Sequence, residues 1–213
     1  MPHELYFIRH AESQMNTNPH LIGGRSNESP LTPRGVTQAR LLGRYLREMD
    51  IIPSRIFSSP AVRTLETARH ALGEMGLTGE PVIDDELQEM TQGDYVGRPR
   101  IDVYTSGVKR EIQRQGKDFK LLGGESMNDV GERMLRWVQL NVPTSTSSEV
   151  ERTLVFGHGL AIRTLAATLY DWSQAQTFQS ATDNTSITLL RSVGEQWQLE
   201  YLGATPHLDG LNE

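Results

Sequence analysis

Short apolar runs alternate with helical patterns through most of the chain, and this alternation constrains its fold more than any other feature. Four runs are typical of buried strands, at residues 5–8, 55–58, 82–83 and 154–156. Apolar residues at helical spacing predict helices at residues 36–46, 62–75, 127–138 and 160–169. Strands separated by helices run parallel, with the helices on the faces of the sheet. The pattern predicts an α/β fold, a three-layer α-β-α sandwich with a mainly parallel central sheet.

The remaining segments fit around this sheet without a second domain. Residues 186–190 and 197–202 alternate in polarity and predict a closing pair of strands. Residues 143–149 predict a surface loop rich in Ser and Thr, and the polar tail from residue 203 is expected to be partly mobile. No internal repeat or linker interrupts the sequence, so residues 1–213 are predicted to form a single domain with one insertion.

The insertion, at about residues 98–120, is expected to be small, helical and basic. It holds seven basic and three acidic residues, a local balance of +4 in a chain whose formal net charge is −6. Two interpretations stay open. A helix with one solvated, charged face accounts for the pattern, and so does a site for a second anionic group on a substrate.

The 213 residues contain no cysteine and no long apolar segment. Disulfides, thiolate catalysis and cysteine-type zinc sites are therefore excluded, which fits a reducing compartment. The first apolar run is too short for a signal peptide, and no segment approaches the length of a membrane span. The negative net charge disfavours nucleic-acid binding. We expect a cytoplasmic protein that binds neither nucleic acid nor membrane.

Two of the predicted strands end in a histidine. His10 follows the first strand directly after Arg9, and His158 follows the last parallel strand between two glycines. The carboxyl ends of parallel strands meet at one edge of a sheet, so both side chains are expected in the same crevice. His158 also lies where a helix begins, and a helix N-terminus favours an anion. The alternative is that Gly157-His158-Gly159 is a turn before a helix, in which His158 has no functional role.

Arg63 and Glu89 are the other candidates for chemistry. Arg63 lies in the first turn of the helix after the second strand, where an arginine opposes the helix dipole unless an anion binds nearby. Glu89 follows the third strand, and a carboxyl at the rim of a crevice can act as a general acid or base. Both could equally be surface residues, since three other acidic residues, at 84–86, closely precede Glu89.

Together these candidates could bind a tetrahedral dianion. Two arginines supply fixed positive charge, one histidine could attack as a nucleophile, and an acid could protonate the leaving oxygen. That combination is typical of phosphoryl transfer through a covalent histidine intermediate. No His-x-His or His-Glu-x-x-His spacing occurs in the sequence, so no metal or other cofactor is expected.

On these residues the chain resembles the histidine phosphatase superfamily and its phosphoglycerate-mutase-like branch. Residues 9–13, Arg-His-Ala-Glu-Ser, are similar to the family signature Arg-His-Gly-Glu-Thr. Further segments resemble family motifs in the family's order, at residues 58–68, 87–97, 123–126 and 157–159. The resemblance covers nearly the whole chain and implies a phosphoglycerate-mutase-like version of the predicted fold.

The resemblance implies a role for each candidate residue. His10 is expected to be the nucleophile that becomes phosphohistidine, and Glu89 the proton donor and then the base for water. Arg9 and Arg63 are expected to bind the phosphoryl group. His158, protonated or donating a hydrogen bond, is expected to stabilise charge on the transferred oxygens. Neither a metal nor another cofactor is implied.

Asn16 and Gly159 complete the expected substrate-binding set. Ala11 stands where the family usually has glycine, and its methyl group could narrow the pocket but is expected to be tolerated. Glu12 is expected to orient His10 or an arginine.

Two departures from the family pattern bear on the reaction. The residues after Glu89 are Met-Thr-Gln where small or basic residues are more usual, so Glu86 is kept as a distant alternative acid. The insertion is short and lacks the Arg-Arg and Pro-Pro-Pro segment associated with true mutases. This favours a phosphatase, in which water reaches the phosphohistidine.

The leading hypothesis is therefore a metal-independent phosphatase that hydrolyses phosphomonoesters of small metabolites and releases inorganic phosphate. A second anionic group on the substrate would account for the charge of the insertion. The alternatives are a phosphoglycerate-type mutase, or a non-catalytic relative that binds phosphate esters or a protein. Homodimers are common among relatives, so a homodimer is one expected form.

Overall fold

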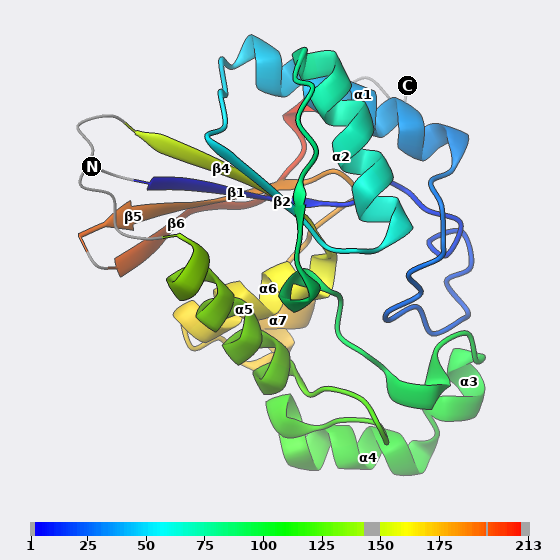
Figure 1. The fold of residues 1–213 in the computed structure, drawn as a ribbon. Helices are drawn as coiled ribbons and strands as arrows, with labels where there is room; N and C mark the ends of the chain where they lie inside the picture. The colour runs from blue at the N-terminus through cyan, green and yellow to red at the C-terminus, as the bar shows by residue number, and fades with distance from the viewer. Residues whose placement is uncertain (1–2, 143–149, 195, 210–213) are drawn as a thin grey trace.

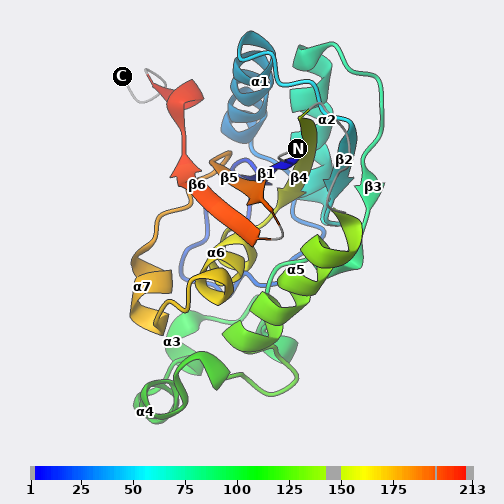
Figure 2. The ribbon, with the colours of Figure 1, turned by 90° about the vertical axis from the view of Figure 1, so that its left-hand side faces the viewer.

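A single sheet organises the computed structural model, which describes residues 3–142, 150–194 and 196–209. Its strand order is β3-β2-β4-β1-β5-β6 (Figures 1 and 2). The strands are β1 (His3–Arg9), β2 (Arg55–Ser58), β3 (Val82–Ile83), β4 (Glu151–Gly157), β5 (Ile187–Val193) and β6 (Gln196–Ala204). The four predicted apolar runs and the predicted closing pair all form strands, but Val82 and Ile83 of β3 are exposed rather than buried.

The sheet is mainly parallel, as predicted. β1 pairs in parallel with β4, β4 with β2, and β2 with β3. The closing strand β5 runs antiparallel to β1 and to β6. All parallel strands therefore end at the same edge of the sheet, which is where a ligand crevice forms in folds of this class.

Helices cover both faces of the sheet (Figure 1). α1 (Pro33–Glu48) and α2 (Val62–Met75) pack together on one face, and α5 (Met127–Asn141) and α6 (Gly159–Leu169) on the other. Alternate residues of β1 face opposite layers. Tyr6 and Ile8 belong to the core beneath α1 and α2, whereas Leu5 and Phe7 belong to the core beneath α5 and α6. The three-layer α-β-α sandwich is thus confirmed.

The helix starts follow the capping signals of the sequence with one exception. Thr32 caps α1 by accepting the backbone N–H of Gly35 at 3.0 Å. Ser126 caps α5 in a capping box with Asp129. The exception is α2, which begins at Val62 and has no side-chain cap. The serine hydroxyls before α2 take other partners.

Residues 98–120, the predicted insertion, form three short helical segments away from the sheet. These are α3 (Arg100–Val103), α4 (Ser106–Gln115) and the 3-10 turn η3 (Gly116–Asp118). Figures 1 and 2 both place α3 and α4 at the end of the molecule furthest from α1. Ile22, Val103 and Leu121 form a small separate core there. α7 (Gln174–Gln179) was not predicted.

Part of the tail is more closely packed than its polarity suggests. The 3-10 turn η4 (Pro206–Leu208) contacts α1, and the His207 side chain is buried. The predicted loop at residues 143–149 and the tail end at 210–213 lie outside the described residues. Within the part of the chain that the structure describes, no helix is long and apolar enough to cross a membrane.

Candidate active site

The parallel pairing of β1 and β4 brings the two histidines together. Arg9 is in register with Gly157, so His10 and His158 follow at neighbouring strand ends. Their ring centroids are 5.3 Å apart, with an interplanar angle of 64°. The backbone N–H of His10 donates to the Gly157 carbonyl at 3.0 Å. The crevice expected at the carboxyl edge of the sheet thus contains both side chains.

The His10 ring is held as a neutral imidazole with one free lone pair. Its Nδ1 lies 2.8 Å from the Ala11 carbonyl oxygen, which can only accept. The ring proton is therefore on Nδ1, and Nε2 carries the lone pair. Burial, together with the positive charges of Arg63 and Arg9, holds the pKa of His10 well below 6.5. Nε2 can act as a nucleophile at neutral pH without prior deprotonation.

His158 has the opposite tautomer and both of its ring nitrogens are occupied. Arg63 Nη2 donates to Nδ1 at 3.1 Å, because a guanidinium has no acceptor. Nε2 therefore carries the proton and donates to Ser59 Oγ at 2.8 Å. Burial and the nearby Arg63 hold the pKa of His158 well below 6.5. Of the two forms expected, the neutral hydrogen-bonding ring fits this environment and the protonated ring does not.

Two guanidinium groups, the buried one of Arg63 and the half-buried one of Arg9, provide the positive charge of the site. Arg63 donates to the Ser26 carbonyl at 2.6 Å, and Arg9 donates to the Thr182 carbonyl at 2.6 Å. Burial and the charge of Arg9 lower the pKa of Arg63 to about 10, so it stays protonated at neutral pH. Among the described residues, neither arginine forms an ion pair with a carboxylate. This uncompensated charge suits a dianionic ligand.

A cavity of about 170 Å³, here called the phosphate cup, contains most of the predicted residues. Six of them line it: Arg9, His10, Asn16, Arg63, Glu89 and Gly159. Arg163 also lines the cup. His158 does not, because its ring is fully buried behind Arg63.

Asn16 is fixed by bonds to its carbonyl oxygen. Asn16 Oδ1 accepts the backbone N–H of Ser13 at 3.0 Å and Nδ2 of Asn184 at 3.3 Å. Asn184 Nδ2 also donates to the His10 carbonyl at 3.0 Å. Because its oxygen is occupied, Asn16 can offer its amide N–H groups to a ligand in the cup.

Gly159 leaves room for Arg9. A Cβ at this position would lie 3.1 Å from Arg9 Cδ and 3.0 Å from Thr182 Oγ1. These separations are tighter than ordinary carbon contacts. The glycine thus lets the guanidinium of Arg9 lie against the first turn of α6.

Glu89 lies where the phosphate cup opens into a larger cavity. One carboxylate oxygen accepts the N–H groups of Met90 at 2.8 Å and Ala161 at 3.1 Å, and the other accepts Leu160 N–H at 3.2 Å. The carboxylate thus caps the N-terminus of α6, where negative charge is favoured. Glu86, the alternative acid, is exposed and lines neither cavity.

The larger cavity, here called the outer cavity, has a volume of about 830 Å³. It shares five lining residues with the cup: Gly23, Gly24, Glu89, Leu160 and Arg163. Its outer wall comes from residues 100–121 and from α7. A bound phosphoester would thus pass from the cup, beside Glu89, into the outer cavity.

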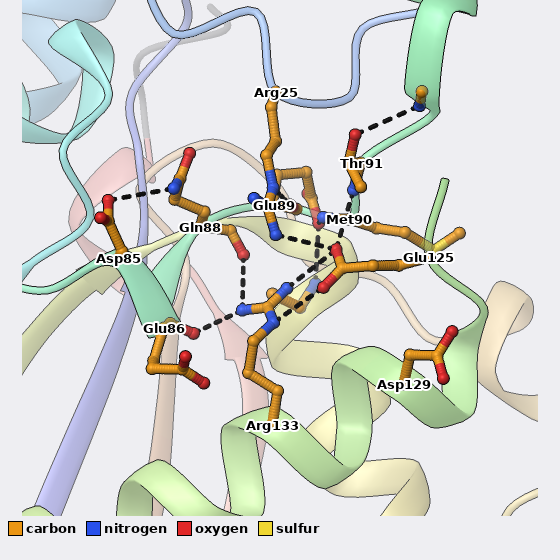
Figure 3. A network of polar contacts seen from close by, with 12 residues as sticks. Arg25, Asp85, Glu86, Gln88, Glu89, Met90, Thr91, Glu125, Asp129 and Arg133 are labelled. Carbon is orange, nitrogen blue, oxygen red and sulfur yellow. Dashed lines mark hydrogen bonds and ion pairs between the residues drawn. The ribbon is translucent and has the colours of Figure 1, made fainter. Parts of the chain in front are cut away.

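An ion-pair network holds the segment that carries Glu89 (Figure 3). Arg133 reaches from α5 to both carboxylate oxygens of Glu125, at 3.0 and 3.2 Å, and to the Gln88 carbonyl at 3.1 Å. Glu125 also accepts Arg25 Nη2 at 3.0 Å, and Arg25 Nε donates to the Glu89 carbonyl at 2.9 Å. The backbone on both sides of Glu89 is therefore tied to α5.

Ala11 lies outside the cup, and Glu12 lies beside an arginine, one of its two expected partners. Ala11 is fully buried against Leu31 and Ala39 and does not line the cup, so its methyl group does not narrow the pocket. The Glu12 carboxylate accepts Thr32 Oγ1 at 2.7 Å and lies 3.9 Å from Arg34. It does not contact His10.

Sequence reasoning missed the residues that hold the predicted ones. Ser59 and Glu125 lie inside segments that resemble family motifs, but the sequence indicates no role for either residue. Arg133 follows a helical pattern typical of a surface arginine, and Asn184 and Thr182 lie in a loop that carries no motif. Only the spacing of Arg163, four residues after Gly159 and therefore on the same face of α6, could have indicated its place in the cup.

A comparison with known families accounts for this arrangement. The model of the histidine phosphatase superfamily (branch 1) matches residues 5–205. The chain belongs to the histidine phosphatase superfamily. Among the relatives of this chain is a 2,3-bisphosphoglycerate-dependent phosphoglycerate mutase from Azorhizobium caulinodans. It is 32% identical over 169 residues, which is 78% of this chain and 80% of the relative.

Solved structures agree with this assignment. A Bacillus stearothermophilus protein, YhfR, is 27% identical, with a TM-score of 0.81 over 96% of this chain and 98% of its own. A mycobacterial glucosyl-3-phosphoglycerate phosphatase is 26% identical, with a TM-score of 0.77 over 96% of this chain and 100% of its own. The fold is therefore phosphoglycerate-mutase-like, and the family contains both mutases and phosphatases.

Proposed function

We propose that this protein is a metal-independent phosphatase that hydrolyses phosphomonoesters of small metabolites through a phosphohistidine. The observation that carries the proposal is the state of His10. Its proton is on Nδ1, its Nε2 lone pair is free, and it lies in a cup with two guanidinium groups that form no ion pair with any carboxylate in the described part of the chain. A neutral imidazole beside a dianion site suits attack on phosphorus.

In the first step, His10 Nε2 attacks the phosphorus atom of the ester. The bond between phosphorus and the ester oxygen breaks, and Glu89 gives its proton to the leaving alcohol. Arg9 and Arg63 bind the phosphoryl oxygens and stabilise the charge that they carry in the transition state. His158 supports this step by accepting a hydrogen bond from Arg63 at 3.1 Å, which holds the guanidinium in place. Its direct contact with the phosphoryl group stays a prediction.

In the second step, water attacks the phosphohistidine. Glu89, now a carboxylate, takes a proton from the water while the bond between phosphorus and Nε2 breaks. Inorganic phosphate leaves and His10 returns to its neutral form. Glu89 is suited to both roles because it lines the cup and the outer cavity, between which the leaving oxygen would lie.

A mutase is the second candidate, supported by the relatives named phosphoglycerate mutase. A mutase would return the phosphoryl group from His10 to another hydroxyl of the sugar acid. Incubation with a phosphoglycerate and a bisphosphoglycerate primer separates the two: a mutase yields the isomeric phosphoglycerate, a phosphatase inorganic phosphate. The short insertion supports the phosphatase.

We also propose that the substrate carries a second anionic group. Arg100, Lys109 and Lys120 line the outer cavity. Lys120 lies 3.3 Å from Asp129, whereas Arg100 stacks on Tyr104 and Lys109 forms no ion pair among the described residues. If neutralising Arg100 and Lys109 leaves kcat/KM unchanged, both for esters with a carboxylate and for esters without one, this part of the proposal fails. Arg98, which lines neither cavity, is the matched control.

A phosphate-release assay across a panel of phosphorylated metabolites, with chelator present, tests the proposed function. We expect chelator-resistant release that is lost in His10→Ala. Chelator-sensitive release, or full release by His10→Ala, would contradict the mechanism. Binding of esters without release would instead support a non-catalytic relative. The cytoplasmic location and the homodimer expected from the sequence belong to the same proposal.

A further inference from the structure

The outer cavity is much larger than a small sugar acid requires. Its volume of about 830 Å³ compares with about 170 Å³ for the phosphate cup. Cavities of roughly 300–1,000 Å³ bury most of the surface of a drug-sized ligand. A three-carbon leaving group would leave most of this space to water.

The wall of the outer cavity is rich in apolar side chains from distant parts of the chain. They include Ile22, Met90, Ile101, Ile112, Phe119 and Phe178. Ile22 is fully buried, so this part of the wall is packed. Apolar parts of a leaving group are removed from water against this wall, whereas the charged side chains of the same cavity, Arg100, Lys109 and Lys120, are left for its anionic group.

Two members of this wall are exposed in a way that the fold does not explain. Ile101 of α3 is 85% exposed and Phe178 of α7 is 54% exposed. They come from helices more than 70 residues apart in the sequence, yet both line the outer cavity. Large exposed apolar side chains that converge on one cavity mark a ligand-binding surface.

The position of the outer cavity assigns its occupant. It joins the phosphate cup at Glu89 and Leu160, beside the predicted proton donor. A group that extends from the phosphoryl oxygen past this carboxyl is the alcohol part of the ester. The occupant is therefore the leaving group of the substrate rather than a separate ligand.

We propose that the enzyme selects phosphomonoesters of alcohols that carry a large apolar, aromatic body. Ile101 and Phe178 determine this specificity by covering the aromatic body at the mouth of the outer cavity. The inference rests on the proposed phosphatase function, and it concerns which ester is hydrolysed rather than how.

A pair of matched esters tests the proposal. Naphthylethyl phosphate and ethyl phosphate are both esters of primary alcohols, so their leaving oxygens are chemically alike. We expect kcat/KM to be about a hundredfold higher for the naphthylethyl ester, because burial of the ring system contributes to binding. Ile101→Ser and Phe178→Ser should each lower that preference by about tenfold, while kcat/KM for ethyl phosphate stays unchanged.

Leu122→Ser is the control for a change at an exposed apolar residue. Leu122 is 79% exposed and lines neither cavity, so its loss should leave both esters unaffected. Equal kcat/KM for the two esters in the wild type overturns the specificity but leaves the phosphatase standing. An equal loss of preference in Leu122→Ser likewise overturns the role of Ile101 and Phe178. Failure to hydrolyse any ester overturns the proposed function and this inference with it.

Discussion

The guanidinium of Arg63 lies 3.1 Å from Nδ1 of His158, and this contact fixes which nitrogen of the histidine carries its proton. Arg63 lies in the first turn of α2, which follows β2, whereas His158 follows β4. The contact therefore locks two strand ends together beneath the phosphate cup. It also leaves His158 to donate only through Nε2, toward Ser59.

The ring states of His10 and His158 can be observed directly. Nitrogen NMR of the free protein at pH 7 should show His10 protonated on Nδ1 and His158 protonated on Nε2. Since the pKa of each ring lies well below 6.5, neither should titrate as pH falls from 7 to 6. His20, whose side chain is exposed, provides the reference signal. A doubly protonated ring at either site at pH 7 would contradict the assignment.

Gly159→Ala should weaken phosphate binding without unfolding the protein. The added Cβ would lie 3.1 Å from Arg9 Cδ, so the Arg9 side chain must shift by a few tenths of an ångström, which displaces its guanidinium within the cup. We expect the Kd for inorganic phosphate, measured by calorimetry, to rise about tenfold, a typical loss for one displaced charged hydrogen bond.

Gly73→Ala is the matched control for this substitution. Gly73 lies within α2, and a Cβ there would meet nothing within 4 Å. Replacing an unhindered helical glycine should stabilise the protein by about 0.5–1 kcal/mol and leave phosphate binding unchanged. Equal phosphate affinity in Gly159→Ala and Gly73→Ala would refute the role of Gly159.

Glu125→Gln tests whether the network positions Glu89. Removing this carboxylate leaves Arg133 without its ion-pair partner and should lower the free energy of unfolding by about 3 kcal/mol. If the acid segment also shifts, kcat should fall more for alkyl esters, whose leaving oxygen needs a proton, than for nitrophenyl phosphate, whose leaving group does not. A purely structural role would lower both rates equally. Arg133→Ala should show the same difference in kcat between the two esters, and Arg133→Lys, which keeps the positive charge, should show a smaller one.

His207 should make the fold less stable in acid. Burial lowers its pKa to about 4, whereas an unfolded histidine titrates near 6.5. Between these values the unfolded chain binds the extra proton, so the free energy of unfolding falls as pH falls. His207→Gln should reduce the loss between pH 7 and pH 5 by about 2 kcal/mol in urea titrations. His20→Gln, at an exposed position, should not reduce this loss. If the free energy of unfolding of His207→Gln falls between pH 7 and pH 5 as steeply as in the wild type, the prediction is refuted.

The sequence could predict the fold and the edge of the sheet that holds the site, because both follow from local pattern. Alternating apolar runs and helical stripes determined the layers, and each strand that ends in a histidine predicted where His10 and His158 lie. These inferences need no knowledge of long-range packing.

The remaining contacts of the site depend on packing between distant residues. Ser59 resembles a helix cap in the sequence, yet its hydroxyl accepts from His158, 99 residues away. Arg133 resembles a surface arginine, yet it is buried against the acid segment, 45 residues before it. Neither position carries a local signal for its partner, because a side chain's contacts across the core follow from the tertiary fold alone.

Trapping the phosphoenzyme tests the central claim most directly. In Glu89→Gln, nitrophenyl phosphate can still transfer its phosphoryl group, but water lacks its base, so the intermediate should accumulate. Rapid quench into alkali followed by mass spectrometry should find a phosphoryl group on His10, with chelator present, and none in the Glu89→Gln, His10→Ala double variant. A phosphoryl group on another residue, or release of nitrophenol with no phosphohistidine, would contradict the mechanism.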